Sequence, residues 1–333
     1  MKNGNMELFS SKAIRCISFI DTPTDWKNDG DRYHYTSAPA LLSIIKNKTI
    51  RFTDVRFMND KSEGCVFIQC MYKHIINNKG KYPLTNEVLN ILFPTIKIDD
   101  LLENEISSVD FYKEKKINSK EGYRSFVFCS SKEPDGLNLW NYYLNNNKYE
   151  GFNFGFNVTD LILSIQKSYI TDTNHIFCYF GNVLYDTEKQ KNEIINCIEY
   201  IENSCNEYDI NTGVLLLNNM IESRGLFFKS KHFKNEKEFR ILFQIQEKDI
   251  NDRKFYNDDK DAIAKIDFCV KNGMIVPFFE IKINEDIIKR ITVSPTLEFD
   301  ITKIGVKELL YSNNFQQSNR NIPIFKSKVP IRF

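Results

Sequence analysis

The segment EKEFRILF, at residues 236–243, has the pattern of a β-strand with two unlike faces. Alternate residues of a strand point to the same side, so Phe239 faces a core while Glu238 and Arg240 face the other way. Charged side chains on one face of an apolar strand are costly unless they are solvated or paired. The segment therefore predicts either a solvated or ion-paired sheet face, or a polar site to which Glu236 and Glu238 contribute.

Other segments of the sequence predict further strands and several helices, and together with this strand they indicate a mixed fold. Residues 125–129 form a near-continuous apolar run, which indicates a buried strand, and residues 152–158 alternate apolar and other side chains. Helical spacing of apolar residues appears at 63–76 and 187–228, and an Asn-Gly turn predicts a hairpin over 262–283. Strands and helices are interspersed with long gaps between strands. The predicted fold class is α+β, with a central mixed or antiparallel sheet and surrounding helices.

The length of 333 residues allows one large domain or two modest ones. Residues 1–31 are polar and weakly patterned, which predicts an N-terminal extension, and 32–333 are predicted to form a single α+β domain. Residues 80–120 are charged and helical in character, and we interpret them as a helical insertion. Hydrophobic residues make up 42% of the chain and aromatic residues 14%, which is enough for a sizeable core.

Composition also limits the location and the partners of the chain. The net charge of +1 does not indicate a protein dominated by phosphate-backbone contacts, although a local basic patch stays open. The 8 cysteines form no Cys-x-x-Cys motif and no zinc spacing, so we interpret them as small buried hydrophobes and expect no metal. No segment has the ~18 apolar residues of a membrane span, and no signal peptide is recognisable. These features predict a cytoplasmic protein without membrane contact.

Several further segments carry residue types that are common in binding sites. His34 lies in a β-prone run, Asn59 and Asp60 are good helix caps, and Trp140 lies on a predicted short helix. Each also has a purely structural explanation, because a lone histidine, a helix cap or an aromatic residue at helical spacing is usually structural. The basic segment 228–232 is either a solvated loop or a phosphate contact. Besides Glu236, Glu238 and His34, the candidate residues are Tyr35, Thr36, Asn59, Asp60, Glu63, Ser130, Trp140, Tyr143, Lys229 and Arg240.

Taken together, these segments resemble a bacterial family known as domain of unknown function 2971. The match is to an ordered set that spans residues 33–295. Its segments are Tyr33-His34-Tyr35-Thr36-Ser37, Leu42-x-x-Ile45, Asn59-Asp60-x-x-Glu63, Phe128-Cys129-Ser130-Ser131, Leu139-Trp140-x-x-Tyr143, Gly151-x-x-x-Gly155-Phe156, Lys229-Ser230, Glu236-x-Glu238-x-Arg240 and Ile291-x-Val293-Ser294-Pro295. One departure is Phe233, where the family more often has Trp, and this exchange of large aromatic residues puts little in doubt.

A second resemblance implies an activity. The order of a His-bearing first strand, a Ser-bearing middle strand and a late Glu strand is similar to the ADP-ribosyltransferase fold, which implies a sheet split around a cleft. In that superfamily an early His or Arg grips NAD, a middle Ser or Tyr supports the nicotinamide side, and a late Glu acts on the ribose. Carried over by position, His34 would grip NAD, Ser130 would be the middle residue and Glu238 the catalytic carboxylate. Glu236 would be its helper on the same strand face.

The resemblance implies an NAD-consuming enzyme with NAD as its substrate and no metal. It would be either an ADP-ribosyltransferase that acts on a nucleic-acid or protein acceptor, or an NAD hydrolase. Cleavage of the nicotinamide–ribose bond passes through an oxocarbenium-like state, and a nearby carboxylate stabilises the developing charge. Tyr35 or Tyr143 would stack on the nicotinamide. Uncharacterised bacterial families of this kind often act in phage defence or as toxins, so the resemblance implies such a cellular role.

Two other functions stay open. A metal-dependent nuclease would use Asp54, Asp60, Glu63 and the Glu pair as oxygen ligands for Mg²⁺, although their spacing matches no recognisable nuclease motif. A non-enzymatic sensor or partner of a neighbouring effector would have an occluded or unpaired Glu face and an exposed apolar patch. The NAD hypothesis instead expects His34 and Glu238 on adjacent central strands, with both side chains facing one cleft.

Overall fold

The computed structural model describes residues 15–18, 30–58, 64–94, 123–143, 150–168, 176–204, 209–246, 250, 266–271, 273–315 and 321–330. The strands in chain order are β1 Arg15–Ser18, β2 Asp31–Thr36, β3 Thr49–Asp54, β4 Tyr123–Ser131, β5 Phe152–Asn157, β6 Ile176–Asn182, β7 Glu238–Gln246, β8 Asp267–Lys271, β9 Met274–Lys282, β10 Ile288–Val293 and β11 Ile324–Lys326. The helices are α1 Ala38–Asn47, α2 Cys65–Asn77, α3 Pro83–Leu92, α6 Leu137–Tyr143, α7 Val158–Ser168, α8 Thr187–Ser204, α9 Ile210–Ser223 and α11 Phe299–Ser312, with short 3₁₀ turns η2 Val55–Phe57, η4 Gly225–Phe227 and η5 Lys231–Glu236. The mixed α+β class predicted from the sequence is confirmed.

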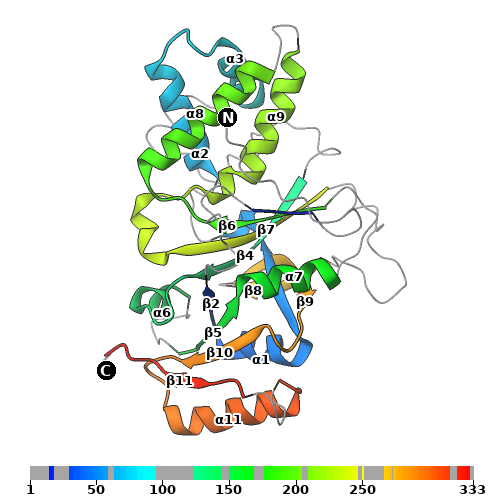
Figure 1. Cartoon of the computed structure of the whole chain (residues 1–333), viewed down its shortest axis with the longest axis vertical. Helices are drawn as coiled ribbons and strands as arrows, with labels where there is room; N and C mark the ends of the chain where they lie inside the picture. The colour runs from blue at the N-terminus through cyan, green and yellow to red at the C-terminus, as the bar shows by residue number, and fades with distance from the viewer. Residues whose placement is uncertain are drawn as a thin grey trace.

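The strands of this described part form one sheet whose main path is β1-β6-β7-β4-β2-β5-β10-β11. Most neighbours along the path are antiparallel, whereas β1 with β6 and β10 with β11 are parallel pairs. The sheet forks at β4, because Ser131 pairs with β2 while Phe126 and Val127 pair with β3. From β3 the second branch continues to β9 and β8. The main path can be followed in Figure 1 from β4 through β2, β5 and β10 to β11.

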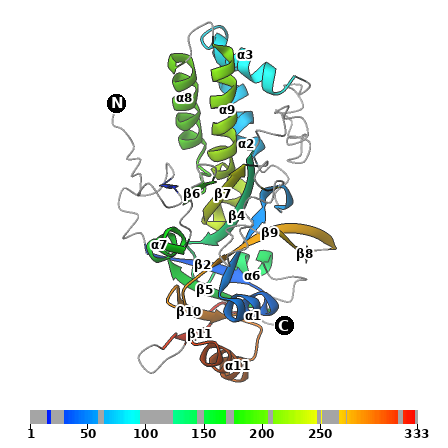
Figure 2. The same cartoon turned by 90° about the vertical axis from the view of Figure 1, so that its right-hand side faces the viewer.

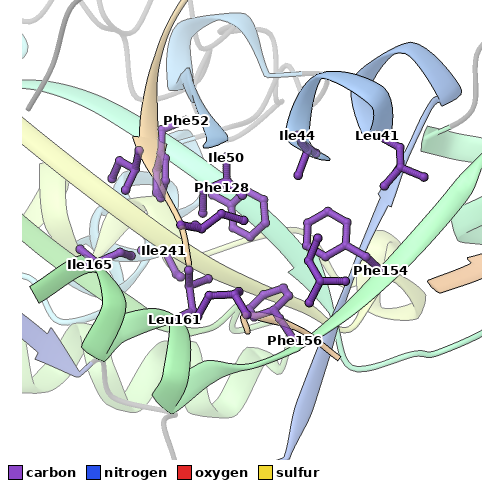
Figure 3. Packing of buried hydrophobic residues seen from close by; sticks show 14 of the residues in the cluster. Leu41, Ile44, Ile50, Phe52, Phe128, Phe154, Phe156, Leu161, Ile165 and Ile241 are labelled. Atoms are coloured by element: carbon purple, nitrogen blue, oxygen red, sulfur yellow. The ribbon is translucent and has the colours of Figure 1, made fainter. Parts of the chain in front are cut away.

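One face of the sheet carries the main hydrophobic core, and we call it the core face. Phe239, Phe154 and Ile291 belong to this core, which α1, α7 and α11 help to cover. Figure 3 shows Leu41 and Ile44 of α1 pointing from the helix toward the phenylalanines of the strands. The burial of many large apolar side chains in one cluster is the main source of stability for such a sheet.

The helices α2, α3, α8 and α9 form a separate layer with a core of its own. Leu89 of α3, Ile198 of α8 and Leu217 of α9 are buried in this second cluster. The layer stands at one end of the sheet, at the top of Figure 1 and Figure 2. α3 falls within the predicted insertion at 80–120, whereas residues 95–122 lie outside the described residues. Among the described helices, none combines the length and the apolar character needed to cross a bilayer.

Candidate functional site

The face opposite the core carries a row of polar residues, and we call it the polar face. Glu238 of β7 lies opposite Ser131 of β4, which lies opposite Tyr33 of β2. The same register continues through Gly155 of β5 to Arg290 of β10. Because directly opposed residues of antiparallel strands project to the same side, these five positions share one face of five neighbouring strands.

At one end of the row, four charged side chains form what we call the buried charge network: Lys229, Glu236, Glu238 and Arg240. All four are buried, with Glu238 2% and Arg240 1% exposed. Arg240 donates two hydrogen bonds of 2.9 Å to the two carboxylate oxygens of Glu238. The Nζ of Lys229 donates to Oε2 of Glu236 at 2.6 Å and to Oε2 of Glu238 at 3.2 Å. Two cations and two anions thereby compensate one another, which is the condition for burying charge at tolerable cost.

The two carboxylates of the network have different affinities for protons. Burial raises the pKa of Glu238, but the charges of Arg240 and Lys229 outweigh burial and lower that pKa to about 2. Burial also raises the pKa of Glu236, which has Lys229 beside it and stands further from Arg240, and here the net shift is upward. Neighbouring carboxylates whose pKa values are pushed apart are a common arrangement at catalytic sites. Glu238 is thus held ionised, and Glu236 takes up a proton more readily.

Backbone and side-chain contacts close the network on several sides. The Tyr185 hydroxyl accepts a hydrogen bond from the backbone N–H of Glu238, and the Ser131 hydroxyl donates to the carbonyl of Glu236 at 2.6 Å. Arg240 also donates to the carbonyl of Leu226 in η4. Most of the hydrogen-bonding capacity of the network is therefore used within the protein.

His34 lies on the core face and not on the face of Glu238. Its ring stacks on Phe128, with the ring centroids 4.5 Å apart, and lies 5.3 Å from the ring of Phe154. β2 and β7 flank β4 without being neighbours, so the structure does not bring His34 and Glu238 together in one cleft. The carbonyl of Cys129 can only accept, so Nδ1 of His34 is the protonated nitrogen in their 2.7 Å hydrogen bond.

The environment of His34 keeps its ring neutral. Burial lowers the pKa of His34 to about 4, and the hydrogen bond to Cys129 only partly opposes this shift. The rings of His34, Phe128 and Phe52 also bridge the two branches of the fork on the core face, with Phe52 and Phe128 5.7 Å apart. In this structure His34 is a packing and hydrogen-bonding residue at the fork of the sheet.

Tyr35 and Trp140 lie on the polar face as a small aromatic cluster. Their rings meet edge to face at 4.7 Å, and both side chains are buried. The Tyr35 hydroxyl donates to the carbonyl of Glu133 and accepts from the N–H of Gly136, while the Trp140 indole donates to Asp135. These contacts hold α6 and the loop before it onto β2.

The remaining predicted residues fall into three groups. Thr36 and Ser130 are buried on the core face, and Ser130 donates to the carbonyl of Phe239 at 3.2 Å. The backbone of Tyr143 ends α6, and its side chain is not described. The residues predicted in the loop between η2 and α2 lie outside the described part of the chain: Asn59, Asp60 and Glu63.

Metal ligation was part of the nuclease hypothesis. Asp54 is fully buried and pairs with Arg56 and Arg124, each at 2.7 Å. In the part of the chain that the structure describes, no group of three or more His, Cys, Asp and Glu side chains is arranged to hold a metal ion. A shallow hollow on α11, lined by Lys307, Glu308, Tyr311 and Ser312, involves none of the predicted site residues.

Sequence reasoning missed Ser131, Tyr33, Tyr185 and Arg290. Ser131 and Tyr33 are each one position away from a predicted residue, and the strand period alone decides which of two neighbours faces Glu238. A signal for Tyr33 was available, because Tyr35 was predicted and shares its face. Arg290 and Tyr185 carried no local signal, since only the pairing of distant strands brings them to this face.

Comparison with known families gives one match. Residues 139–241 match the family model described as Protein of unknown function (DUF2971), which confirms the resemblance over that segment. The segment contains most of α6, all the elements from β5 to η5 and the beginning of β7, and it includes the whole buried charge network. The search of curated proteins gives no match. The search of solved structures gives none either.

Proposed function

We propose that this protein cleaves NAD at the nicotinamide–ribose bond, either to hydrolyse it or to transfer ADP-ribose to a nucleic acid or protein. One observation carries the proposal: the early, middle and late motif strands β2, β4 and β7 are consecutive neighbours, and Tyr33, Ser131 and Glu238 lie in register on one face. A polar row of this kind, whose Glu238 lies in the segment that matches an uncharacterised family, is better suited to holding a ligand than to packing a core.

The roles differ from those that the sequence suggested. Glu238, held ionised by Arg240, would stabilise the positive charge that develops on the ribose as nicotinamide leaves. Glu236, with its raised pKa, would accept the proton of the attacking water or acceptor hydroxyl. Tyr33 takes the place assigned to His34, because it is the β2 residue in register with Ser131 and Glu238.

Substrate access requires one contact to open. Arg240 holds both oxygens of Glu238, whereas Lys229 is 3.2 Å from Oε2 of Glu238 and 2.6 Å from Glu236. The contact of Lys229 with Glu238 is thus longer and weaker than its contact with Glu236. A ribose hydroxyl that donates to Oε2 would replace it and leave the pair of Lys229 with Glu236 intact.

The test is nicotinamide release from NAD by the full chain, with and without nucleic-acid and protein acceptors. Glu238→Gln is expected to lower the rate by about 100-fold or more, as for the loss of other groups that stabilise transition-state charge. Glu193→Gln is the matched control, because Glu193 is also a buried carboxylate paired with an arginine, Arg224, but lies in the helical layer. It should destabilise the fold without changing the rate. No release by the wild type, or equal rates in both variants, would refute the proposal.

A second candidate function is binding of a partner protein without catalysis. The charge network is closed, and the hairpin of β8 and β9 exposes apolar side chains, among them Val270, 77% exposed, and Ile275, 69% exposed. These two residues lie directly opposite each other, and Phe268 shares their face. Figure 2 shows the hairpin projecting from the rest of the molecule. Ile275→Lys should then abolish co-purification with the product of an adjacent gene and leave nicotinamide release unaffected.

A further inference from the structure

Arg290 lies at the far end of the polar row, opposite a glycine and beside two aromatic rings. Its register partner is Gly155, and its guanidinium lies 4.3 Å from the ring centre of Phe325 and 5.5 Å from that of Tyr33. A Cβ atom at position 155 would stand 2.7 Å from Cγ of Arg290 and 3.0 Å from Cε1 of Tyr33. Only glycine at this position lets the two side chains approach each other across β5.

The charge of Arg290 is not compensated as that of five other arginines is. Within the described residues, Arg240 pairs with Glu238, Arg124 with Asp54, and similar ion pairs hold Arg51, Arg56 and Arg224. Among the same residues, Arg290 has no carboxylate partner.

The polar contacts of Arg290 are instead with neutral groups. It donates to Thr292 at 3.4 Å, its charge lowers the pKa of Tyr33 against the larger effect of burial, and its buried Nε has no acceptor among the described residues. Asp31 acts electrostatically on Tyr33 but makes no ion pair with Arg290 in the described contacts. Nε is enclosed by the protein, but the residue is only half-buried, and the exposed part of its guanidinium can donate to an anionic acceptor.

The distance from Glu238 fits a nucleotide. Neighbouring strands are about 4.8 Å apart, so β2 lies roughly 10 Å from β7, and the side chain of Arg290 reaches across Gly155 toward β2. A ribose at Glu238 and a pyrophosphate beside Tyr33 can therefore be held by one extended ligand. A planar guanidinium with several donors binds phosphate oxygens in pairs.

We infer that Arg290, positioned over Gly155 and assisted by Tyr33 and Thr292, binds the pyrophosphate of the nucleotide whose ribose lies at Glu238. The inference deepens the proposed function and rests on it for the identity of the ligand. The binding of a phosphate-bearing nucleotide at Arg290 can nevertheless be measured without any turnover.

The experiment is calorimetric titration of the full chain with ADP and with inorganic pyrophosphate. Arg290→Gln is expected to weaken binding of both by about 10- to 100-fold, the usual effect of losing charge-assisted hydrogen bonds. Arg290→Lys, which keeps the charge and the packing beside Phe325, should weaken binding less. Arg51→Gln removes a paired arginine of β3 and should leave binding unchanged. Thermal unfolding of each variant shows that the fold is retained.

The possible outcomes separate this inference from the proposed function. ADP binding that depends on Arg290, in a protein that releases no nicotinamide, would support the site and refute the NAD-cleaving activity. Nicotinamide release with an unchanged KM for NAD in Arg290→Gln would refute the site alone. Absence of ADP and pyrophosphate binding in the wild type, or equal binding in Arg290→Gln and Arg51→Gln, would also overturn the inference.

Discussion

The two faces of β2 and β4 differ completely although their residues are adjacent in sequence. His34 and Ser130 turn toward phenylalanines on the core face, while Tyr33 and Ser131 turn toward Glu238 on the polar face. A shift of one residue along a strand exchanges the two environments. A motif that places a histidine and a serine in the right order therefore identifies the strands of a site but not the side chains that line it.

The faces also handle polar groups in different ways. On the core face His34 and Ser130 each donate to a backbone carbonyl within a mainly apolar cluster. On the polar face the charge network balances two cations against two anions, while Arg290 has no carboxylate partner in the described residues. Compensated charge is typical of a structural element, and uncompensated charge is typical of a binding position. The polar face carries both.

Breaking the charge network should have the largest effect on stability. Arg240→Met removes both hydrogen bonds of the arginine and leaves the buried carboxylate of Glu238 with the longer contact to Lys229 as its remaining ion pair among the described residues, so the free energy of unfolding should fall by about 3–5 kcal/mol. Glu133→Gln is the control, because its ion pair with Lys237 is partly exposed and should contribute at most about 1 kcal/mol. Urea unfolding at pH 7 measures both. Similar losses in the two variants would show that the network is more open to water than its burial indicates.

The two faces of the sheet should lose stability in different pH ranges, because His34 and Glu238 take up protons at different pH values. The pKa of His34 is about 4 in the folded protein and 6.5 when unfolded, so below pH 6.5 the unfolded chain binds a proton that the folded chain does not. The free energy of unfolding should fall by about 2 kcal/mol between pH 7 and pH 5 from this group alone. His34→Gln, which keeps a donor for the Cys129 carbonyl, should remove that part of the pH dependence.

Glu238 gives the matching control for the acid experiment. Its pKa is 4.5 unfolded and about 2 folded, so its contribution to stability is complete above pH 4.5 and is lost as the pH falls toward 2. Glu238→Gln should therefore keep the slope of the wild type between pH 7 and pH 5, although its stability is lower throughout. A wild-type slope in His34→Gln would mean that the ring is solvated and that the core face is not closed around it.

Many strands and helices could be predicted from the sequence, because the spacing of apolar residues reflects which side of a strand or helix is buried. The alternation at 152–158 and the apolar run at 125–129 correspond to β5 and β4, and β8 and β9 pair as an antiparallel hairpin within the predicted range 262–283. The α1 helix begins at Ala38, directly after Ser37, whose hydroxyl accepts a hydrogen bond from the backbone N–H of Ala40 as an N-cap does. These signals depend only on residues that are close together in the sequence, so they can be recognised without knowledge of the fold.

The site was only partly predictable, since its geometry depends on strand pairing. The Glu run was predicted to be either an ion-paired face or a polar site, and its ion pairs with Lys229 and Arg240 lie within a short stretch of sequence. The position of His34 relative to Glu238 depends on which strand lies between them and on the register of both pairs. No pattern within either segment contains that information. For the same reason, no pattern in the sequence around Arg290 indicates a binding site.

The smallest expected effect tests how tightly the polar row is built. Gly155→Ala places a methyl group against the stem of Arg290 and the ring of Tyr33, and the crowding should cost about 1 kcal/mol of stability. Gly305→Ala is the opposite case, because position 305 lies within α11 with nothing within 4 Å, and alanine there should stabilise the helix by about 1 kcal/mol. Thermal or urea unfolding of the two variants should show shifts of opposite sign. A stabilising Gly155→Ala would mean that Arg290 moves aside freely, so that the approach of Arg290 to Tyr33 is not fixed by the sheet.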